Sequence, residues 1–203
     1  MKEFLTITAA FVVFALSHSI LAADSVKAKL LSVLGERAYM YRFLYSVLSL
    51  VLIAVIYWQF PPDGQVLYRV ASPWRWLMLA IQAIMGVLFI KTVIDFQGSD
   101  FLGYRSLRTR AATPEEHLNI EGLFRFVRHP LYVIATIYLL AAPDMTVGRL
   151  AWTTNIILYF WIGTFFEERR LVAQFGDAYR EYQQRVPRFI PRLRRRRKQH
   201  SQA

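Results

Sequence analysis

Long apolar runs without a charged residue dominate this sequence. The first covers residues 4–23 and has 20 residues, and at about 1.5 Å per residue a helix of that length crosses the ~30 Å hydrocarbon layer of a bilayer. Runs of the same kind cover 43–60, 76–90 and 150–166. A signal peptide is an alternative for the first run, although its end lacks the small-x-small cleavage pattern. The runs predict an all-α, polytopic integral membrane protein with about five transmembrane helices.

The fourth expected segment is shorter than the others. Residues 131–142 are apolar and lie between Pro130 and Pro143, and as a helix they span only about 18 Å. We therefore expect a short or broken element at Arg128-His129-Pro130. Because irregular backbone at membrane depth needs protein or water around it, this break predicts a polar cavity nearby.

Composition excludes several classes of protein and of site. The chain has 203 residues, no cysteine and 15% aromatic residues, which excludes a disulfide-stapled scaffold and a disordered chain. Its four histidines stand far apart and no Gly-rich phosphate loop occurs, so we expect no metal site and no Rossmann domain. We expect a single domain over 1–191, with a cofactor-binding part at about 122–191.

The net charge of +11 is distributed very unevenly. With five crossings and an outer N-terminus, the inner segments hold 20 Lys and Arg, whereas the outer ones hold Lys2, Arg69, Arg75 and Arg149. This asymmetry predicts an outer N-terminus and a cytoplasmic C-terminus, in a membrane that we expect to be the bacterial inner membrane. The basic tail 192–203 fits anionic lipid headgroups better than nucleic acid, which we do not expect as a partner.

Polar residues that could carry chemistry gather in the inner segments. They are Arg128-His129-Pro130-Leu131-Tyr132, Glu167-Glu168, and the stretch from Arg185 to Pro191. Between the last two, the apolar spacing predicts one amphipathic helix over 167–184, in which Gly176 is a point for a kink. It is either a lid over a cytoplasmic pocket or a helix that only lies on the membrane. Thr113-Pro114-Glu115-Glu116 predicts a further helix start.

Four motifs of the C-terminal part resemble the isoprenylcysteine carboxyl methyltransferase superfamily. They are Phe126-Val127-Arg128-His129-Pro130-Leu131-Tyr132, Glu167-Glu168-x-x-Leu171, Phe175-Gly176-x-x-Tyr179-x-x-Tyr182, and Val186-Pro187-Arg188-Phe189-Ile190-Pro191. The N-terminal half is similar to the methanethiol S-methyltransferase and NnrU-like branches. That likeness is carried by His18-Ser19-x-Leu21-Ala22, Lys27, Tyr57-Trp58-Gln59-Phe60, Phe101-Leu102-Gly103-Tyr104-Arg105 and Pro143-x-Met145-Thr146-x-Gly148.

The resemblance implies a membrane methyltransferase that uses S-adenosylmethionine and acts on a small thiol or a lipophilic, isoprenylcysteine-like acceptor. It implies catalytic roles for Arg128 and Glu168. It implies a cofactor site made of His129, Pro130, Tyr132, Glu167, Glu168, Tyr179, Tyr182 and Arg188. We place His18, Lys27 and Arg125 on the acceptor side, although a helix–helix hydrogen bond is an alternative for His18.

The sequence departs from the family pattern at two positions. Ile134 stands where the family motif usually has Gly, and Arg149 stands where the methanethiol branch tends to have His. Both departures bear on the choice of acceptor. Two other functions stay open, namely a non-enzymatic accessory or transport protein of the NnrU-like kind and an NADPH-dependent membrane reductase of related architecture.

Overall fold

The computed structural model describes residues 1–97, 103–110 and 118–191. The predicted helix start at 113–116, part of the 101–105 motif and the basic tail 192–203 lie outside these residues. The structure is mostly helical, as predicted. In chain order the elements are α1 (Lys2–Ala22), α2 (Asp24–Leu34), η1 (Gly35–Met40), α3 (Tyr41–Gln59), β1 (Val66–Arg69), α4 (Trp74–Gln97), α5 (Tyr104–Thr109), η2 (Gly122–Arg125), α6 (Pro130–Leu140), β2 (Asp144–Thr146), α7 (Val147–Phe175) and α8 (Asp177–Arg185).

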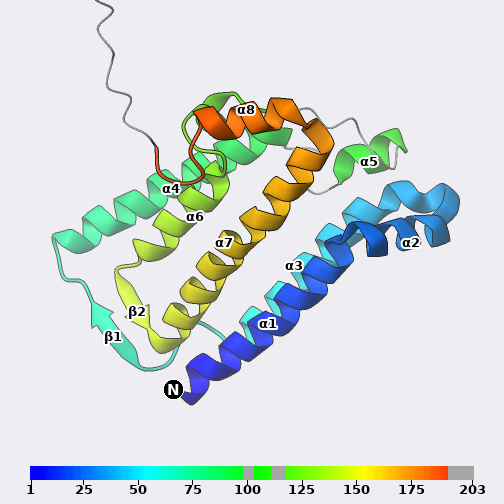
Figure 1. Ribbon diagram of the computed structural model, residues 1–203. Coiled ribbons are helices and arrows are strands. Elements are labelled where there is room, and N and C mark those ends of the chain that lie inside the picture. The colour runs from blue at the N-terminus through cyan, green and yellow to red at the C-terminus, as the bar shows by residue number, and fades with distance from the viewer. Residues whose placement is uncertain (98–102, 111–117, 192–203) are drawn as a thin grey trace, which may run out of the picture.

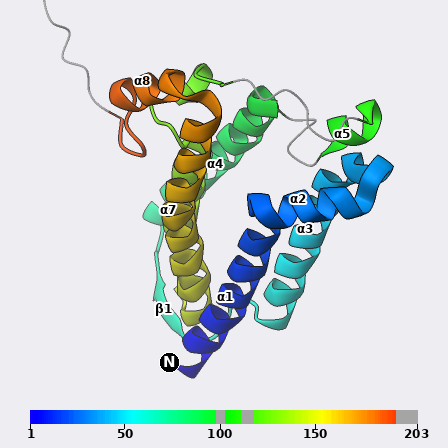
Figure 2. The same ribbon diagram turned by 45° about the vertical axis from the view of Figure 1, so that its right-hand side comes forward.

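The long helices run back and forth between two ends of the molecule (Figure 1). The N-terminus, β1 and β2 lie at one end, and α2, α5 and α8 lie at the other, which both views show (Figures 1 and 2). We call these the β end and the α8 end. Within residues 1–97, 103–110 and 118–191, three stretches are long and apolar enough to cross a membrane: Lys2–Ala22, a part of Asp24–Gln59, and Trp74–Asp95. The fourth predicted segment, α6, has only 11 residues, and the number of crossings stays a prediction.

The long helices expose apolar side chains instead of burying them. Val13 on α1 is 67% exposed, Val55 on α3 is 59% exposed, and Val87 on α4 is 67% exposed. Soluble monomers rarely expose apolar surface of this extent to water. In a bilayer the same side chains contact lipid, so their exposure costs no hydrophobic free energy. This inverted pattern agrees with an integral membrane protein.

The buried core lies where α1 packs on the first half of α7. Ile7, Phe11, Ala151 and Trp152 form it, and the rings of Phe11 and Trp152 meet edge to face at 5.9 Å between centroids. The indole N–H of Trp152 donates to the carbonyl of Phe60 over 2.9 Å. The core therefore fixes α7 against α1 and α3.

The β end closes through a short antiparallel pair of β1 and β2. The guanidinium of Arg75 donates to both carboxylate oxygens of Asp144 over 2.8 and 2.7 Å. Gly148 lies so close to the loop after α3 that a Cβ there would stand 2.6 Å from the carbonyl oxygen of Asp63. These contacts hold the starts of α4 and α7 together.

Two boundaries differ from the expectation. The helix predicted over 150–166 is longer in the structure, where α7 runs from Val147 to Phe175. Glu167 and Glu168 therefore lie within this helix and not after its end. The single helix predicted over 167–184 is split at Gly176, which has φ +57°. Glycine adopts this non-helical backbone conformation at little cost. The chain therefore changes direction at Gly176, and α8 folds over the end of α7 (Figure 2).

Candidate functional site

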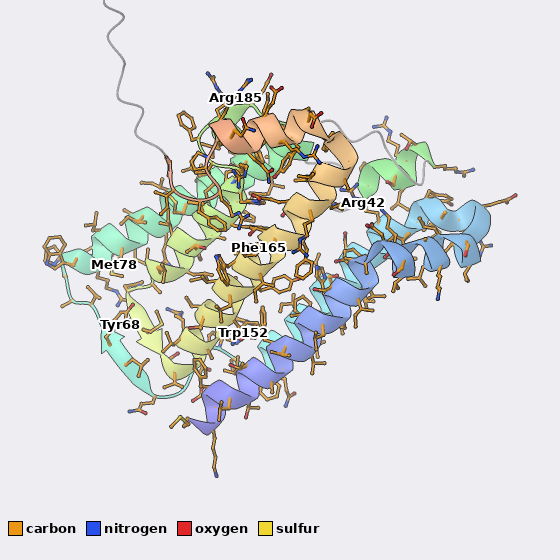
Figure 3. All side chains as sticks on the ribbon, in the orientation of Figure 1. Arg42, Tyr68, Met78, Trp152, Phe165 and Arg185 are labelled. Atoms are coloured by element: carbon orange, nitrogen blue, oxygen red, sulfur yellow. The ribbon has the colours of Figure 1, made fainter. Side chains whose placement is uncertain are left out.

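The candidate site lies at the α8 end, where the start of α6, the end of α7, α8 and the segment after α8 meet. Figure 3 marks Phe165 on this part of α7 and Arg185 at the end of α8. The chain after α8 returns to the start of α6: the backbone N–H of Arg128 donates to the carbonyl of Pro187 over 2.9 Å, and that of His129 to Arg188 over 3.3 Å. This pairing brings two motifs together that are about 60 residues apart in the sequence.

Glu168 is the centre of the site. Its side chain is only 6% exposed, and four side chains surround its carboxylate. Arg128 donates through Nε to Oε1 over 2.8 Å, and Arg188 donates through Nε to Oε1 over 3.1 Å and through Nη2 to Oε2 over 2.7 Å. Gln183 Nε2 donates to Oε2 over 3.0 Å, and His129 Nε2 lies 3.1 Å from Oε1. We call these five residues the Glu168 cluster: Arg128, His129, Glu168, Gln183 and Arg188.

The cluster keeps Glu168 ionised. Burial acts to raise the pKa of this carboxyl, but the hydrogen bonds from His129, Arg188 and Arg128 outweigh burial and hold the pKa well below its usual range. Removing a charge from water is costly unless it is paired and hydrogen-bonded. Glu168 meets both conditions.

The arginines of the cluster also hold the backbone around it. Arg128 Nη1 donates to the carbonyls of Gln183 over 3.0 Å and Val186 over 2.6 Å, which fixes the end of α8. The guanidinium of Arg188 lies 4.4 Å from the centroid of the Phe165 ring. These contacts therefore hold the guanidinium group of each arginine in a fixed orientation.

Glu167 belongs to a second layer of the site, next to the cluster. The hydroxyl of Tyr132 donates to Glu167 Oε2 over 3.0 Å, and His129 Nδ1 lies 3.6 Å from the same oxygen. The ring of Tyr132 stacks on His129 at 5.4 Å and on Phe160 at 4.5 Å. The Glu167 side chain is 36% exposed, so this carboxylate is accessible where that of Glu168 is not.

Tyr179 and Tyr182 lie behind the cluster and do not line its surface. Both are buried with Val186 against the end of α7, and the hydroxyl of Tyr182 donates to the carbonyl of Phe124 over 2.7 Å. Burial raises the pKa of Tyr182 to about 12. The phenol therefore stays protonated and fastens α8 to η2.

A pocket of about 320 Å³ opens beside the cluster. Its lining consists of Phe165, Glu168, Arg169, Val172, Gln183 and Arg188. In the described part of the chain, no group of three or more His, Cys, Asp and Glu side chains could hold a metal ion. The pocket lies next to the guanidinium group of Arg188, which Glu168 and Phe165 hold in place.

The residues expected on the acceptor side do not join this site. His18 lies between α1 and α3, where its Nδ1 is 2.8 Å from the hydroxyl of Ser49 and its Nε2 is 2.8 Å from that of Tyr45. This is the helix–helix hydrogen bond of the alternative interpretation. Lys27 lies on α2, and Arg125 is exposed at the end of η2.

The two departures from the family pattern lie in different places. Ile134 is buried on α6, one turn after Pro130. Arg149 lies at the β end, where its Nη1 donates to the carbonyl of Asp144 over 2.7 Å. Ile134 can thus affect the site through packing, while Arg149 lies at the opposite end of α7.

Sequence reasoning missed three contributors to the site. Gln183 binds Glu168, Phe165 lies under Arg188, and Phe160 stacks on Tyr132. Two of them carried a signal in the helical spacing, because Phe160 and Phe165 precede Glu167 and Glu168 by seven and three residues and therefore share faces with them. Gln183 carried none besides its place beside Tyr182.

Comparisons with known proteins give consistent matches. A sequence model of the family described as NnrU protein matches residues 6–189. Methanethiol S-methyltransferase 2 of Bradyrhizobium diazoefficiens is 28% identical over 89% of this chain and 70% of its own length. Methanethiol S-methyltransferase of Pseudomonas deceptionensis is 31% identical over 90% of this chain and 70% of its own length.

A third relative matches over a shorter range with a higher identity. Protein-S-isoprenylcysteine O-methyltransferase of Schizosaccharomyces pombe is 37% identical over 84 residues, which are 38% of this chain and 34% of that protein. No solved structure matches the chain significantly. The chain spans about two thirds of the length of the methanethiol enzymes.

Proposed function

This chain belongs to the NnrU family, and from that premise we propose that it is a membrane-embedded methyltransferase that uses S-adenosylmethionine. One observation carries the proposal beyond the names of relatives. Three of the four motifs expected to build a cofactor site, at the start of α6, on α7 and after α8, converge on one carboxylate, Glu168. Structural packing alone does not require two arginines and a histidine around a single buried acid.

The residues at this end have the chemistry that such a cofactor needs. Glu167 is a carboxylate for hydroxyl or ammonium groups, Arg188 is a donor for a carboxylate, and Phe165 and Val172 are apolar side chains of the pocket wall. The pocket of about 320 Å³ that Arg188 and Glu168 line lies at the lower end of the usual range for small-molecule sites, about 300–1,000 Å³. When bound, S-adenosylmethionine supplies a methyl group on a positively charged sulfonium.

We assign different roles to the two acidic residues. Both oxygens of Glu168 are engaged by guanidinium groups, so Glu168 positions Arg128, His129 and Arg188 and does not itself bind a ligand. Oε1 of Glu167 has no hydrogen-bond donor among the described residues, and the side chain is 36% exposed. Glu167 is therefore the carboxylate that contacts the cofactor.

For the acceptor we propose a small thiol or a lipophilic acceptor. A thiol with a pKa of about 8.5 is a few per cent thiolate at neutral pH, so the protein need not supply a strong base. What its residues supply is binding, orientation and exclusion of water. This agrees with a site whose groups are held rigidly and whose central acid is already ionised.

The first experiment tests the cofactor. Purified protein in nanodiscs is titrated with S-adenosylhomocysteine and, separately, with NADPH. We expect saturable binding of S-adenosylhomocysteine alone and methyl transfer from labelled S-adenosylmethionine to a member of a panel of small thiols, prenylcysteines and lipids. Binding of NADPH alone would favour a reductase, and binding of neither, without turnover, would favour an accessory or transport protein.

The second experiment tests the assignment of Glu167. Glu167→Gln keeps the size of the side chain and removes its charge, so we expect the affinity for S-adenosylhomocysteine to fall about tenfold or more, the worth of one charge-assisted hydrogen bond. Glu181→Gln on α8 is the matched control, because Glu181 is 63% exposed and pairs with Arg185. Equal affinities in both variants would contradict the assignment.

A further inference from the structure

The pocket beside the Glu168 cluster has an excess of positive charge. Two guanidinium groups, from Arg128 and Arg188, share the single carboxylate of Glu168, and a third, from Arg169, lines the pocket. Among the described residues, Glu168 is the only acid in the lining. Its oxygens are occupied, so the wall of the pocket is positive.

Arg188 is held in place as a donor at this wall. Its Nε and Nη2 bind Glu168, and its guanidinium lies on the Phe165 ring at 4.4 Å. A guanidinium has five N–H donors, and Nη1 of Arg188 has no acceptor among the described residues. The pocket therefore offers fixed, charged donors next to the apolar side chains of Phe165 and Val172.

We propose that this pocket binds the anionic group, a carboxylate or a similar oxyanion, of a ligand whose adjoining part is apolar. Arg169 and Arg188 contact the anion, and Phe165 and Val172 contact the apolar part. This inference rests on the proposed function for the identity of the ligand, because the anion can belong to the methyl acceptor or to the amino-acid part of the cofactor. The chemistry is the same in both cases.

Arg169→Gln tests the pocket without disturbing the cluster, because Arg169 is exposed and makes none of the hydrogen bonds to Glu168. Arg170→Gln, the next position on α7, is the matched control, since Arg170 does not line the pocket. The affinities for benzoate and for uncharged benzamide are measured by ligand-observed NMR in phosphatidylcholine nanodiscs. This readout needs neither cofactor nor turnover.

We expect the wild type to bind benzoate about tenfold more tightly than benzamide, which corresponds to one charge-assisted contact. Arg169→Gln should lose most of this preference, and Arg170→Gln should keep it. Equal affinities for the two probes in the wild type, or an equal loss in both variants, would overturn the proposal.

Two further measurements distinguish the sources of the anion. If Arg169→Gln weakens the binding of S-adenosylhomocysteine but not that of its analogue without the carboxylate, the anion belongs to the cofactor. If the variant lowers the rate ratio of 3-mercaptopropionate to 2-mercaptoethanol relative to the wild type, the anion belongs to the acceptor. Failure of the wild type to bind S-adenosylhomocysteine refutes the proposed function, whereas the benzoate comparison decides the anion pocket independently.

Discussion

At the scale of single residues, Glu168 determines how the site is built. A buried carboxylate that accepts from two arginines and a glutamine is rarely the most stable filling for a core, because the groups lose their hydration. Removing it is worse, because the guanidinium groups of Arg128 and Arg188 then stay behind without a counter-charge. Glu168 therefore acts as the connection between α6, α7 and the segment after α8.

Glu168→Gln should lower the apparent melting temperature. Breaking a buried ion pair costs about 3–5 kcal/mol, which for a chain of this length corresponds to roughly 6–20 °C. Differential scanning fluorimetry in detergent measures the change. Glu181→Gln, at an exposed acid of α8, should change the melting temperature by less than about 2 °C; a similar small change in Glu168→Gln would contradict the role of Glu168.

The contribution of Glu168 should also depend on pH. Because the pKa in the folded protein lies below the ordinary value of 4.5, the unfolded chain binds the proton first as the pH falls. The stabilisation is then fully present above about pH 4.5 and is lost as the pH falls toward the lower, folded value. The difference in melting temperature between wild type and Glu168→Gln should stay constant from pH 8 to 5 and shrink below pH 4.5. A difference that shrinks above pH 5 would point to another group.

At the scale of elements, the turn at Gly176 decides where α8 lies. A continuous helix over 167–184 would carry Gln183 away from Glu168. With φ +57° at Gly176, α8 turns back, and Gln183 reaches Glu168. The lid-like position of α8 thus follows from one residue.

Gly176→Ala should lower the stability of the protein, whereas Gly163→Ala should not. A Cβ meets nothing within 4 Å at either position, so the effect of each alanine on stability depends on the backbone conformation alone. At Gly176 the positive φ costs an alanine about 1–3 kcal/mol. Gly163 lies inside α7, where alanine is favoured by about 1 kcal/mol. Thermal unfolding should show a decrease for the first variant and an increase or no change for the second, and a decrease in both would show that packing matters at Gly163.

At the scale of the whole molecule, charge and fold agree about the two ends. The described basic segments of α2, α5, η2 and α8 lie at the α8 end (Figures 1 and 2), and the β end holds the few basic residues expected outside. The site therefore lies at the end for which the positive-inside rule predicts the cytoplasm.

Cysteine labelling tests this orientation directly, because the chain has no cysteine of its own. Gln65→Cys marks the β end and Glu181→Cys marks α8. With an outer N-terminus, a membrane-impermeant maleimide should label Gln65→Cys in intact cells and Glu181→Cys only after permeabilisation. The reverse pattern would invert the topology and place the site on the outer face.

Much of the architecture follows from the sequence alone. Charge-free runs of about 20 residues form helices, because backbone N–H and C=O groups in lipid must form hydrogen bonds within their own segment. The missing length between Pro130 and Pro143 determined that α6 is short. The motifs also named six residues that the structure brings together, namely Arg128, His129, Tyr132, Glu167, Glu168 and Arg188. Their roles stay a prediction.

The tertiary structure decided what each residue of the site contacts. Glu167 and Glu168 are neighbours in the sequence, but one helical step of about 100° directs Glu168 into the guanidinium groups and Glu167 toward Tyr132. Likewise, the sequence could not show that His18 is satisfied between α1 and α3, or that Gln183 reaches Glu168 after the turn at Gly176. Periodicity determines which face a side chain is on, whereas packing between distant segments determines its partner.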